Sequence, residues 1–309
     1  MIFGLIEGEA QTTSAFTGLP GKIARLSFDG LRFGLILAMC SIGLSLIFGT
    51  TKLVNFAHGE LVTFGAVVAL ALDGPLPFLA AAAVAILLTA VAGGVNEILI
   101  WRPLRKRGTG LIAMLVISIG LSLFVRHVVL WRIGGGRQSY SKFTSQKGIE
   151  YGPLSVTPRQ LATIAIATIV LVITAYIITN TRLGKAMRAV SDNRDLSESS
   201  GINVDSVIRT VWIGGAGLAG LGGVLLGLDR QVSWDMGFNL LLLIFAAVTL
   251  GGLGTAYGAL AGSIVVGLFV SLSTLVVPPE IKNVGALVIL ILILLVRPQG
   301  ILGRAERIG

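Results

Sequence analysis

The sequence predicts an all-α polytopic membrane protein with about eight transmembrane helices and a re-entrant or broken helix near residues 55–72. Three observations support this fold class. Apolar residues make up 54% of the 309 residues and charged residues only 13%, whereas a soluble domain has roughly 25% charged residues. The mean hydropathy is +0.89. Glycine, which lets membrane helices approach one another closely, occurs 41 times.

Apolar stretches of about 20 residues define the expected spans. Residues 1–30 form an N-terminal lead-in, and residues 31–303 form one transmembrane domain with no soluble domain beside it. A further apolar segment, 59–72, follows a polar interruption. Inside the apolar run 238–277, the sequence Gly251-Gly252-Leu253-Gly254 predicts a sharp turn or a broken helix. The expected spans are 31–49, 76–100, 111–131, 160–180, 206–228, 238–253, 256–277 and 283–297.

Basic residues gather in three segments, and these segments set the predicted orientation. By the positive-inside rule we place all three in the cytoplasm. Two spans separate the first segment from the second, and four separate the second from the third, so the parity agrees. The same rule explains the net charge of +9 without a nucleic acid as a partner. The segments hold Arg102, Arg105, Lys106 and Arg107; Arg182, Lys185, Arg188 and Arg194; and Arg297, Arg304 and Arg307.

The charges leave two interpretations of the N-terminal region. Lys22, Arg25 and Arg32 favour a cytoplasmic start. Both chain ends can then lie inside only if the segment 55–72 does not cross the membrane, which favours a re-entrant or discontinuous helix there. The alternative is an external start with nine full spans. Parity places the loop 132–159 outside, although its basic residues run against the rule.

A polar break, Asn55-Phe56-Ala57-His58-Gly59-Glu60, interrupts this apolar chain. Ionisable groups at membrane depth normally face a helix bundle or a water-filled path. His58 and Glu60 are two residues apart, so on a helix they lie on different faces and do not form a metal pair or a proton dyad. In a structural interpretation, Asn55 caps a helix that starts near Phe56, and Glu60 interacts with the helix dipole. In the functional interpretation, these residues line a substrate path.

The cytoplasmic segment 184–205 is longer and more polar than a connecting turn requires. It has mixed charge and no long apolar run, and Gly201 can end a short helix. Two interpretations are equal on the pattern alone. The segment is either a solvated loop or a short helix that docks into another protein.

Sequence motifs of enzymes and of nucleotide-binding proteins are absent. The chain has no GxxxxGK[ST] phosphate loop, no HExxH, no CxxC and no GxSxG. We therefore expect no catalytic residue, no metal site and no cofactor in this chain. A transport protein is expected rather than an enzyme.

Four segments together resemble the permease subunit of branched-chain amino-acid ABC importers, the LivH-like family. The first contains the polar break, the second is the cytoplasmic segment, the third is the glycine run, and the fourth is the C-terminal ending. The resemblance covers roughly residues 30–303. The segments read GLSLIFGTTKLVNFAHGELVTFGAVVA, GKAMRAVSDNRDLSESSGINVDSVI, GGLGTAYGALAGS and RPQGILG.

The resemblance implies a translocation path for branched-chain or other small amino acids in the bacterial cytoplasmic (inner) membrane. It implies four partners: a homologous second permease, two ATPase subunits that bind ATP and Mg²⁺, and an external substrate-binding protein. It also implies that segment 184–205 couples to the ATPase, although Leu196 to Ser200 is more polar than expected. The implied coupling residues are Arg188, Asp192, Asn193, Leu196, Gly201 and Ile202.

The path itself is expected at the polar break and the glycine turn. The predicted path residues are Asn55, His58, Glu60, Gly251, Gly252 and Gly254. External segments 132–159 and 229–237 would receive the binding protein, with Asp229, Arg230, Trp234 and Asp235 as candidates. Two alternatives remain: a permease for urea or short amides, and a stand-alone secondary transporter or channel that uses Glu60 as its ion site.

Overall fold

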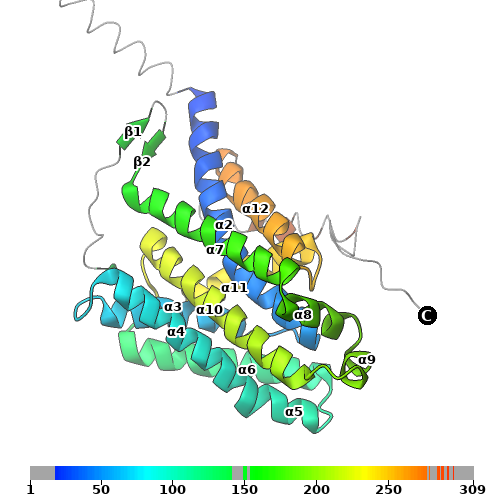
Figure 1. The fold of residues 1–309 in the computed structure, drawn as a ribbon. Helices are drawn as coiled ribbons and strands as arrows, with labels where there is room; N and C mark the ends of the chain where they lie inside the picture. Colours follow the sequence, from blue (N-terminus) through cyan, green and yellow to red (C-terminus); the bar gives the residue numbers. More distant parts are fainter. Residues whose placement is uncertain are drawn as a thin grey trace, which may run out of the picture.

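The structure, a computed structural model, describes residues 18–140, 149–151 and 154–276, together with scattered positions between 278 and 295. Helices form nearly all of this part of the chain (Figure 1). The helices are α2 (Leu19–Thr51), α3 (His58–Leu72), α4 (Phe78–Asn96), the π-helix η1 (Glu97–Trp101), α5 (Arg102–Lys106), α6 (Leu111–Ile133), α7 (Pro158–Asn180), α8 (Arg182–Asp192), α9 (Arg194–Ser199), α10 (Val204–Arg230), α11 (Met236–Gly251), α12 (Ala256–Leu272) and the 3₁₀ turn η3 (Ser273–Leu275).

Six helical stretches in the described part of the chain are long and apolar enough to cross a membrane. They are α2, the continuous helix from α4 to α5, α6, α7, α10, and α12 with its 3₁₀ turn. Helices α3 and α11 are apolar but shorter. The chain is therefore a multi-pass membrane protein, and the all-α prediction is confirmed.

Each predicted span from 31–49 to 256–277 corresponds to one continuous helical stretch. The predicted span 283–297 lies largely, and the basic tail entirely, outside the described residues. Helix α2 begins at Leu19, well before the predicted start at residue 31, because Pro20 occupies its first turn. Proline suits that position since its fixed φ is helical and its missing N–H would have had no helical partner.

Helix α2 is the central helix, and α10 lies along it in the antiparallel direction. Gly43 lies against Gly215, and Arg32 pairs with Asp229, so the residue numbers of the two helices run in opposite directions. A Cβ at Gly43 would lie 2.5 Å from the carbonyl oxygen of Gly215, so no larger residue fits at this crossing. Small residues of this kind allow membrane helices to pack backbone against backbone.

These directions define the two ends of the bundle. Gly49, near the end of α2, lies beside Ser191 of α8 and Gly254 of the α11–α12 turn. The start of α2 lies at the opposite end. With α8 placed in the cytoplasm by its charge, α2 starts on the external side. A cytoplasmic start of α2, predicted from Lys22 and Arg25, and a cytoplasmic α8 therefore exclude each other, because the two lie at opposite ends of the bundle. We keep the placement of α8, whose basic segment is the stronger signal.

The segment between α2 and α4 is discontinuous rather than re-entrant. Helix α4 runs antiparallel to α10, because Thr89 lies against Gly220 and Gly93 lies against Trp212. Helix α4 thus starts on the external side. The non-helical residues 52–57 and the 15-residue α3 together return the chain there. The broken helix predicted near 55–72 is confirmed, whereas the nine full spans of the alternative are not, since α3 is too short for one.

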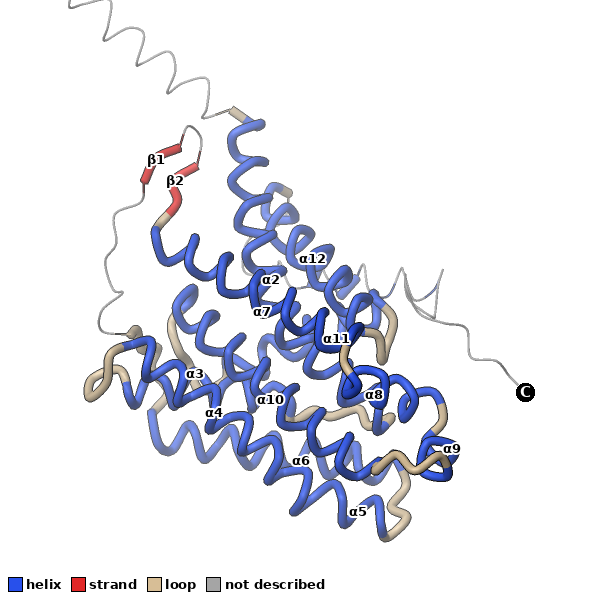
Figure 2. The backbone as a smooth tube through the Cα atoms, in the orientation of Figure 1, coloured by secondary structure: helices blue, strands red, loops and turns tan. Residues whose placement is uncertain are grey.

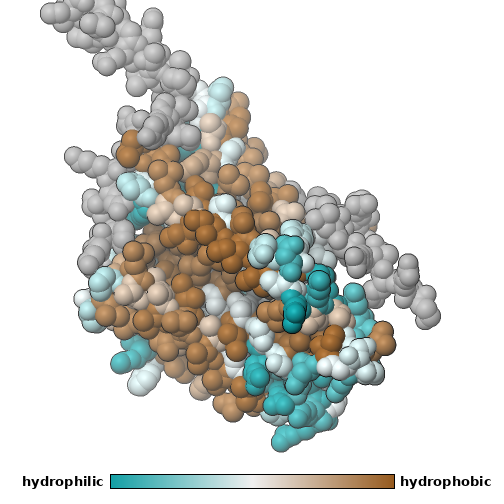
Figure 3. Space-filling model, viewed as in Figure 1, coloured by the Kyte–Doolittle hydropathy of each residue, from teal (hydrophilic) through white to brown (hydrophobic). Residues whose placement is uncertain are grey.

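The surface of the bundle shows the same polarity. In Figure 3, hydrophobic residues cover the middle of the visible face, and hydrophilic residues gather at one end. Figure 2, in the same orientation, places α5, α8 and α9 at that hydrophilic end. We refer to it below as the inner end.

The external connection between α6 and α7 contains a short hairpin. Strand β1 (Ile149–Tyr151) pairs antiparallel with β2 (Leu154–Val156). Before it, Gln138 forms a bridge with Val232, which fixes the end of α6 beside the end of α10. The described residues that follow α6, fixed by the bridge of Gln138 to Val232, therefore lie at the end opposite α8, as parity predicts.

Candidate functional site

The polar break begins where α2 ends. Lys52 adopts a left-handed conformation (φ 57°), and its N–H bonds to the carbonyl of Phe48. The chain then continues without helix to Ala57. Asn55 is fully buried, and its Oδ1 accepts a hydrogen bond of 3.0 Å from the N–H of Ala57. Asn55 therefore closes a turn before the helix. It does not cap the helix as predicted, because α3 starts only at His58.

His58 and Glu60 point to different neighbours, as their spacing predicts. The Nε2 of His58 lies 2.9 Å from the carbonyl oxygen of Cys40 in α2. The Oε1 of Glu60 accepts a hydrogen bond of 2.8 Å from Ser122 in α6. Both side chains are buried. Glu60 also lies in the first turn of α3, where the helix dipole favours a negative charge.

A polar stripe on α6 faces this break, and sequence analysis missed it. Ser118 accepts a hydrogen bond of 3.0 Å from the N–H of Phe56, and Ser122 binds Glu60. Arg126, one turn further, lies 4.0 Å from the ring centre of Phe238 in α11. The spacing of four residues puts all three on one helix face. That spacing was a usable signal, because polar residues at helical period inside a span indicate a buried partner.

The glycine run Gly251–Gly254 forms the predicted sharp turn between α11 and α12. Gly252 and Gly254 have φ values of 110° and 82°, which side chains disfavour. A Cβ at Gly251 would lie 1.8 Å from the carbonyl oxygen of Gly258. This turn packs against Gly49 of α2, whereas His58 contacts Cys40 of the same helix. The nine-residue separation of Cys40 and Gly49 corresponds to about 13 Å along α2, so the glycine turn lies closer to the inner end. The two halves of the predicted path therefore lie at different depths.

The cytoplasmic segment forms two short helices, α8 and α9, followed by α10. A polar side chain starts each one. Thr181 accepts a hydrogen bond from Gly184 N, Asn193 from Leu196 N, and Asn203 from Ser206 N, at 3.2, 2.9 and 3.0 Å. Such caps satisfy N–H groups that have no helical partner.

The predicted coupling residues fall into an outward group and an inward group. Asp192, Asn193 and Leu196 are exposed, and the Leu196 side chain is 63% exposed. Gly201 has a φ of 82° and ends the α9 turn, as predicted.

The inward group attaches the segment to the bundle. Ile202 packs on the buried cluster that contains Trp101, Trp212 and Met187. Arg188 donates a hydrogen bond to the carbonyl of Ile178 at the end of α7. One side of the segment is thus fixed to the membrane domain, while the other is available to a partner.

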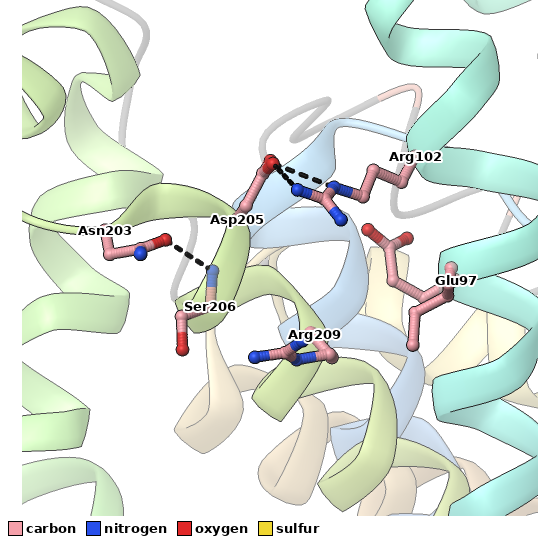
Figure 4. Close-up of a pocket in the computed structure, with 7 residues that line it drawn as sticks. Glu97, Arg102, Asn203, Asp205, Ser206 and Arg209 are labelled. Carbon is pink, nitrogen blue, oxygen red and sulfur yellow. Dashed lines mark hydrogen bonds and ion pairs between the residues drawn. The ribbon is translucent and has the colours of Figure 1, made fainter.

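A polar pocket of ≈ 230 Å³ lies beside the first turn of α10. Figure 4 shows that residues of η1 and α5 face residues of α10 across it. Arg102 donates a hydrogen bond of 2.9 Å to Asp205, and Arg105 pairs with the buried Glu97. The Arg102–Asp205 pair is half-exposed, so it contributes little to stability. It does connect the coupling segment to the inner end of the α4–α5 helix. The lining residues are Glu97, Ile98, Arg102, Asn203, Asp205, Ser206 and Arg209.

At the external end, the predicted docking residues differ in their exposure. Asp229 is turned inward, where it pairs with Arg32 at 2.9 Å, so it is not a surface residue. Asp235 precedes α11 and stays near the surface. Burial acts to raise the pKa of the Asp235 carboxyl, but hydrogen bonds from Ser233 and Asn239 outweigh burial and hold this pKa below its usual range. Asp235 therefore carries a negative charge at neutral pH.

No cluster of three or more His, Cys, Asp or Glu that could hold a metal ion occurs in the described ranges. The geometry instead has two parts. A broken helix with buried polar groups lies within the bundle, and a capped, partly exposed pair of helices lies at the inner end. This combination suits a membrane component that a cytoplasmic partner acts upon.

Comparison with known proteins agrees with this arrangement. The chain is 31% identical over 294 residues to the high-affinity branched-chain amino acid transport system permease protein BraD of Pseudomonas aeruginosa, covering 90% of this chain and 95% of the relative. It is equally similar, with the same coverage, to the permease protein LivH of Escherichia coli. A probable LivH of Methanocaldococcus jannaschii is 29% identical, over 87% of this chain and 89% of the relative.

No solved structure matches the chain. Residues 26–296 match the family described as the permease component of the branched-chain amino acid transport system. This match covers both the polar break and the cytoplasmic helices. The chain belongs to this family of transport permeases.

Proposed function

We propose that the chain forms the translocation path of an ABC importer for branched-chain amino acids in the bacterial cytoplasmic membrane. It is a transport subunit and not an enzyme, like the relatives it resembles. In this proposal a second permease completes the path, and two ATPase subunits bind ATP and Mg²⁺. An external binding protein delivers the amino acid, and this chain needs no cofactor of its own.

The observation that carries the proposal is the form of the α8–α9 segment. Helix α9 presents an apolar Leu196 among charged neighbours, with 63% of that side chain exposed. A partner that covers this leucine would remove its apolar surface from water, which stabilises the contact. Asn203 and Asp205 follow directly, and Asp205 bonds to Arg102 of α5. A force on α9 would therefore reach the helices of the bundle.

Reconstitution of the complete transporter in proteoliposomes tests the proposal. Uptake of labelled leucine should need the binding protein outside, the ATPase subunits and ATP inside. Replacing the coupling surface by a polar linker across residues 184–203 should abolish both uptake and the ATPase activity stimulated by the loaded binding protein. The variant must still insert in the membrane and stay folded. Its retention in carbonate-washed membranes checks insertion, and size-exclusion chromatography of the solubilised protein checks folding.

Two results would contradict the proposal. Leucine uptake by the isolated chain along an ion gradient would identify a secondary transporter. Uptake of urea or short amides, with none of leucine, would leave the ABC mechanism in place but overturn the substrate. A matched control changes the exposed Arg25 at the external end of α2 to Gln, which should leave uptake unchanged.

A further inference from the structure

Only one of the two carboxylate oxygens of Glu60 has a hydrogen-bond partner among the described residues. Its Oε1 accepts the hydrogen bond from Ser122, but Oε2 is buried and has no hydrogen-bond partner among the described residues. The whole residue is 2% exposed. A buried carboxylate oxygen without a donor is costly, so such a group in a membrane protein normally serves a ligand or a moving partner.

Arg126 lies on the same face of α6, one turn beyond Ser122. It is 15 residues from the inner start of α6 and seven from its external end, or about 22 Å and 10 Å along the helix axis. Its guanidinium lies over the ring of Phe238, 4.0 Å from the centre, and 5.9 Å from the ring centre of Trp234. Its Nε is buried without a hydrogen-bond partner in the described part of the chain.

Glu60 contacts Ser122, and Arg126 lies one helical turn further along α6, so both charged groups lie near the same stretch of this helix. The positive charge of Arg126 acts on Glu60, yet no ion pair joins them among the described residues. Aromatic faces hold an arginine but leave its N–H donors free for an anion. The site thus offers a carboxylate oxygen and a guanidinium, each with unused hydrogen-bonding capacity.

An apolar stripe lies beside these charges on α11. Phe238 and Leu242 are 37% and 48% exposed, and Phe245 contacts the ring of Phe56 in the polar break, with 5.0 Å between ring centres. Positions 238, 242 and 245 share one helix face. An apolar side chain held between the charged groups and this stripe would lose contact with water.

From this arrangement we propose that Glu60 and Arg126 bind the two charged groups of the amino acid during its translocation. Glu60 binds the α-ammonium group and Arg126 binds the α-carboxylate, while the stripe on α11 contacts the aliphatic side chain. Ser122 positions the Glu60 carboxylate. The inference rests on the proposed function, since it assigns the zwitterion carried by that transport to named residues.

A double-variant comparison in the reconstituted transporter tests this assignment. The variants are Arg126→Gln, Glu60→Gln and the two combined, and Arg25→Gln is the control for loss of an arginine charge. Maximal uptake at saturating loaded binding protein is measured, together with the concentration of that protein giving half-maximal uptake. Each single variant should lower maximal uptake about tenfold or more, as expected for a lost hydrogen bond to a charged group.

The combined variant distinguishes two explanations: that both residues bind the substrate, or that Glu60 and Arg126 only neutralise each other's charge. If both residues bind the amino acid, uptake by the combined variant is as low as that of the worse single variant or lower. Half-saturation should stay within about twofold, because delivery precedes the site. Recovery of uptake in the combined variant would mean that the charges only compensate each other, and this would overturn the proposal. Normal uptake by Arg126→Gln would overturn it as well.

Conservative variants keep the test decisive if Arg126→Gln does not insert. Arg126→Lys and Glu60→Asp retain the charges but change the reach of each group, and both should lower maximal uptake. Wild-type rates in both would overturn the proposal. Failure of the wild-type assembly to take up any delivered amino acid would instead contradict the proposed function, so the two failures are distinguishable.

Discussion

Replacing Leu196 by Ala should weaken the association of this permease with its ATPase subunits. Complete burial of a leucine side chain contributes about 1.5–3 kcal/mol. Since 63% of the Leu196 side chain is exposed in the free chain, a partner that covers it gains about 1–2 kcal/mol. The Leu196→Ala variant should therefore raise the dissociation constant about fivefold to thirtyfold.

Titration of the purified, labelled permease with ATPase subunits measures this constant directly. Ser199→Ala is the matched control on the same helix, because the Ser199 hydroxyl only bonds back to the carbonyl of Asp195. Neither change should alter the thermal unfolding of the free permease, since both side chains are exposed. Unchanged affinity for Leu196→Ala would refute Leu196 as part of the contact surface, and equal weakening by Ser199→Ala would show that burial of the leucine is not the cause.

Two further predictions concern the packing of the bundle. Gly223→Ala should destabilise the protein by about 1–3 kcal/mol, because the added Cβ would lie 1.9 Å from the carbonyl oxygen of Val62. Gly214→Ala on the same helix meets nothing within 4 Å and should be neutral or stabilising by up to about 1 kcal/mol; equal melting temperatures of the two variants in detergent would contradict this packing. Arg32→Gln should cost about 1.5–3 kcal/mol, because it removes the 2.9 Å ion pair with Asp229 and leaves Asp229 only Arg230 at 3.8 Å, and Arg32→Gln combined with Asp229→Asn should recover part of the loss. A melting temperature like that of the wild type for Arg32→Gln would show that the pair does not stabilise the fold.

The helical spans could be predicted from the sequence because length and hydropathy determine them locally. The broken helix at 55–72 and the helix end at Gly201 were also predictable, since polar residues and glycine mark interruptions in any apolar run. The basic residues near the start of α2 and those of α8 predict opposite directions for α2, and only the packing of the helices shows this conflict. Lys22 and Arg25 are weak signals beside the glycine contacts that fix α2 against α10 and α12.

Contacts between distant residues account for the rest. Glu60 and Ser122 are 62 positions apart, and Arg102 and Asp205 are 103 apart. No single-sequence pattern pairs such residues, although the four-residue period of polar residues on α6, which sequence analysis missed, was a usable sign of a buried face. The roles of the predicted path and coupling residues stay predictions until transport is measured.

The three side-chain caps at Thr181, Asn193 and Asn203 have a mechanical consequence. Each one fixes the junction at which a new helix begins, so α8, α9 and α10 meet at angles that local hydrogen bonds define. Although Gly201 lies between α9 and α10, the Asn203 cap follows it directly and holds the start of α10, so a displacement of α9 is passed on to α10. Rotation of α9 by a few degrees would swing the inner end of α10, and the residues near its middle would move with it.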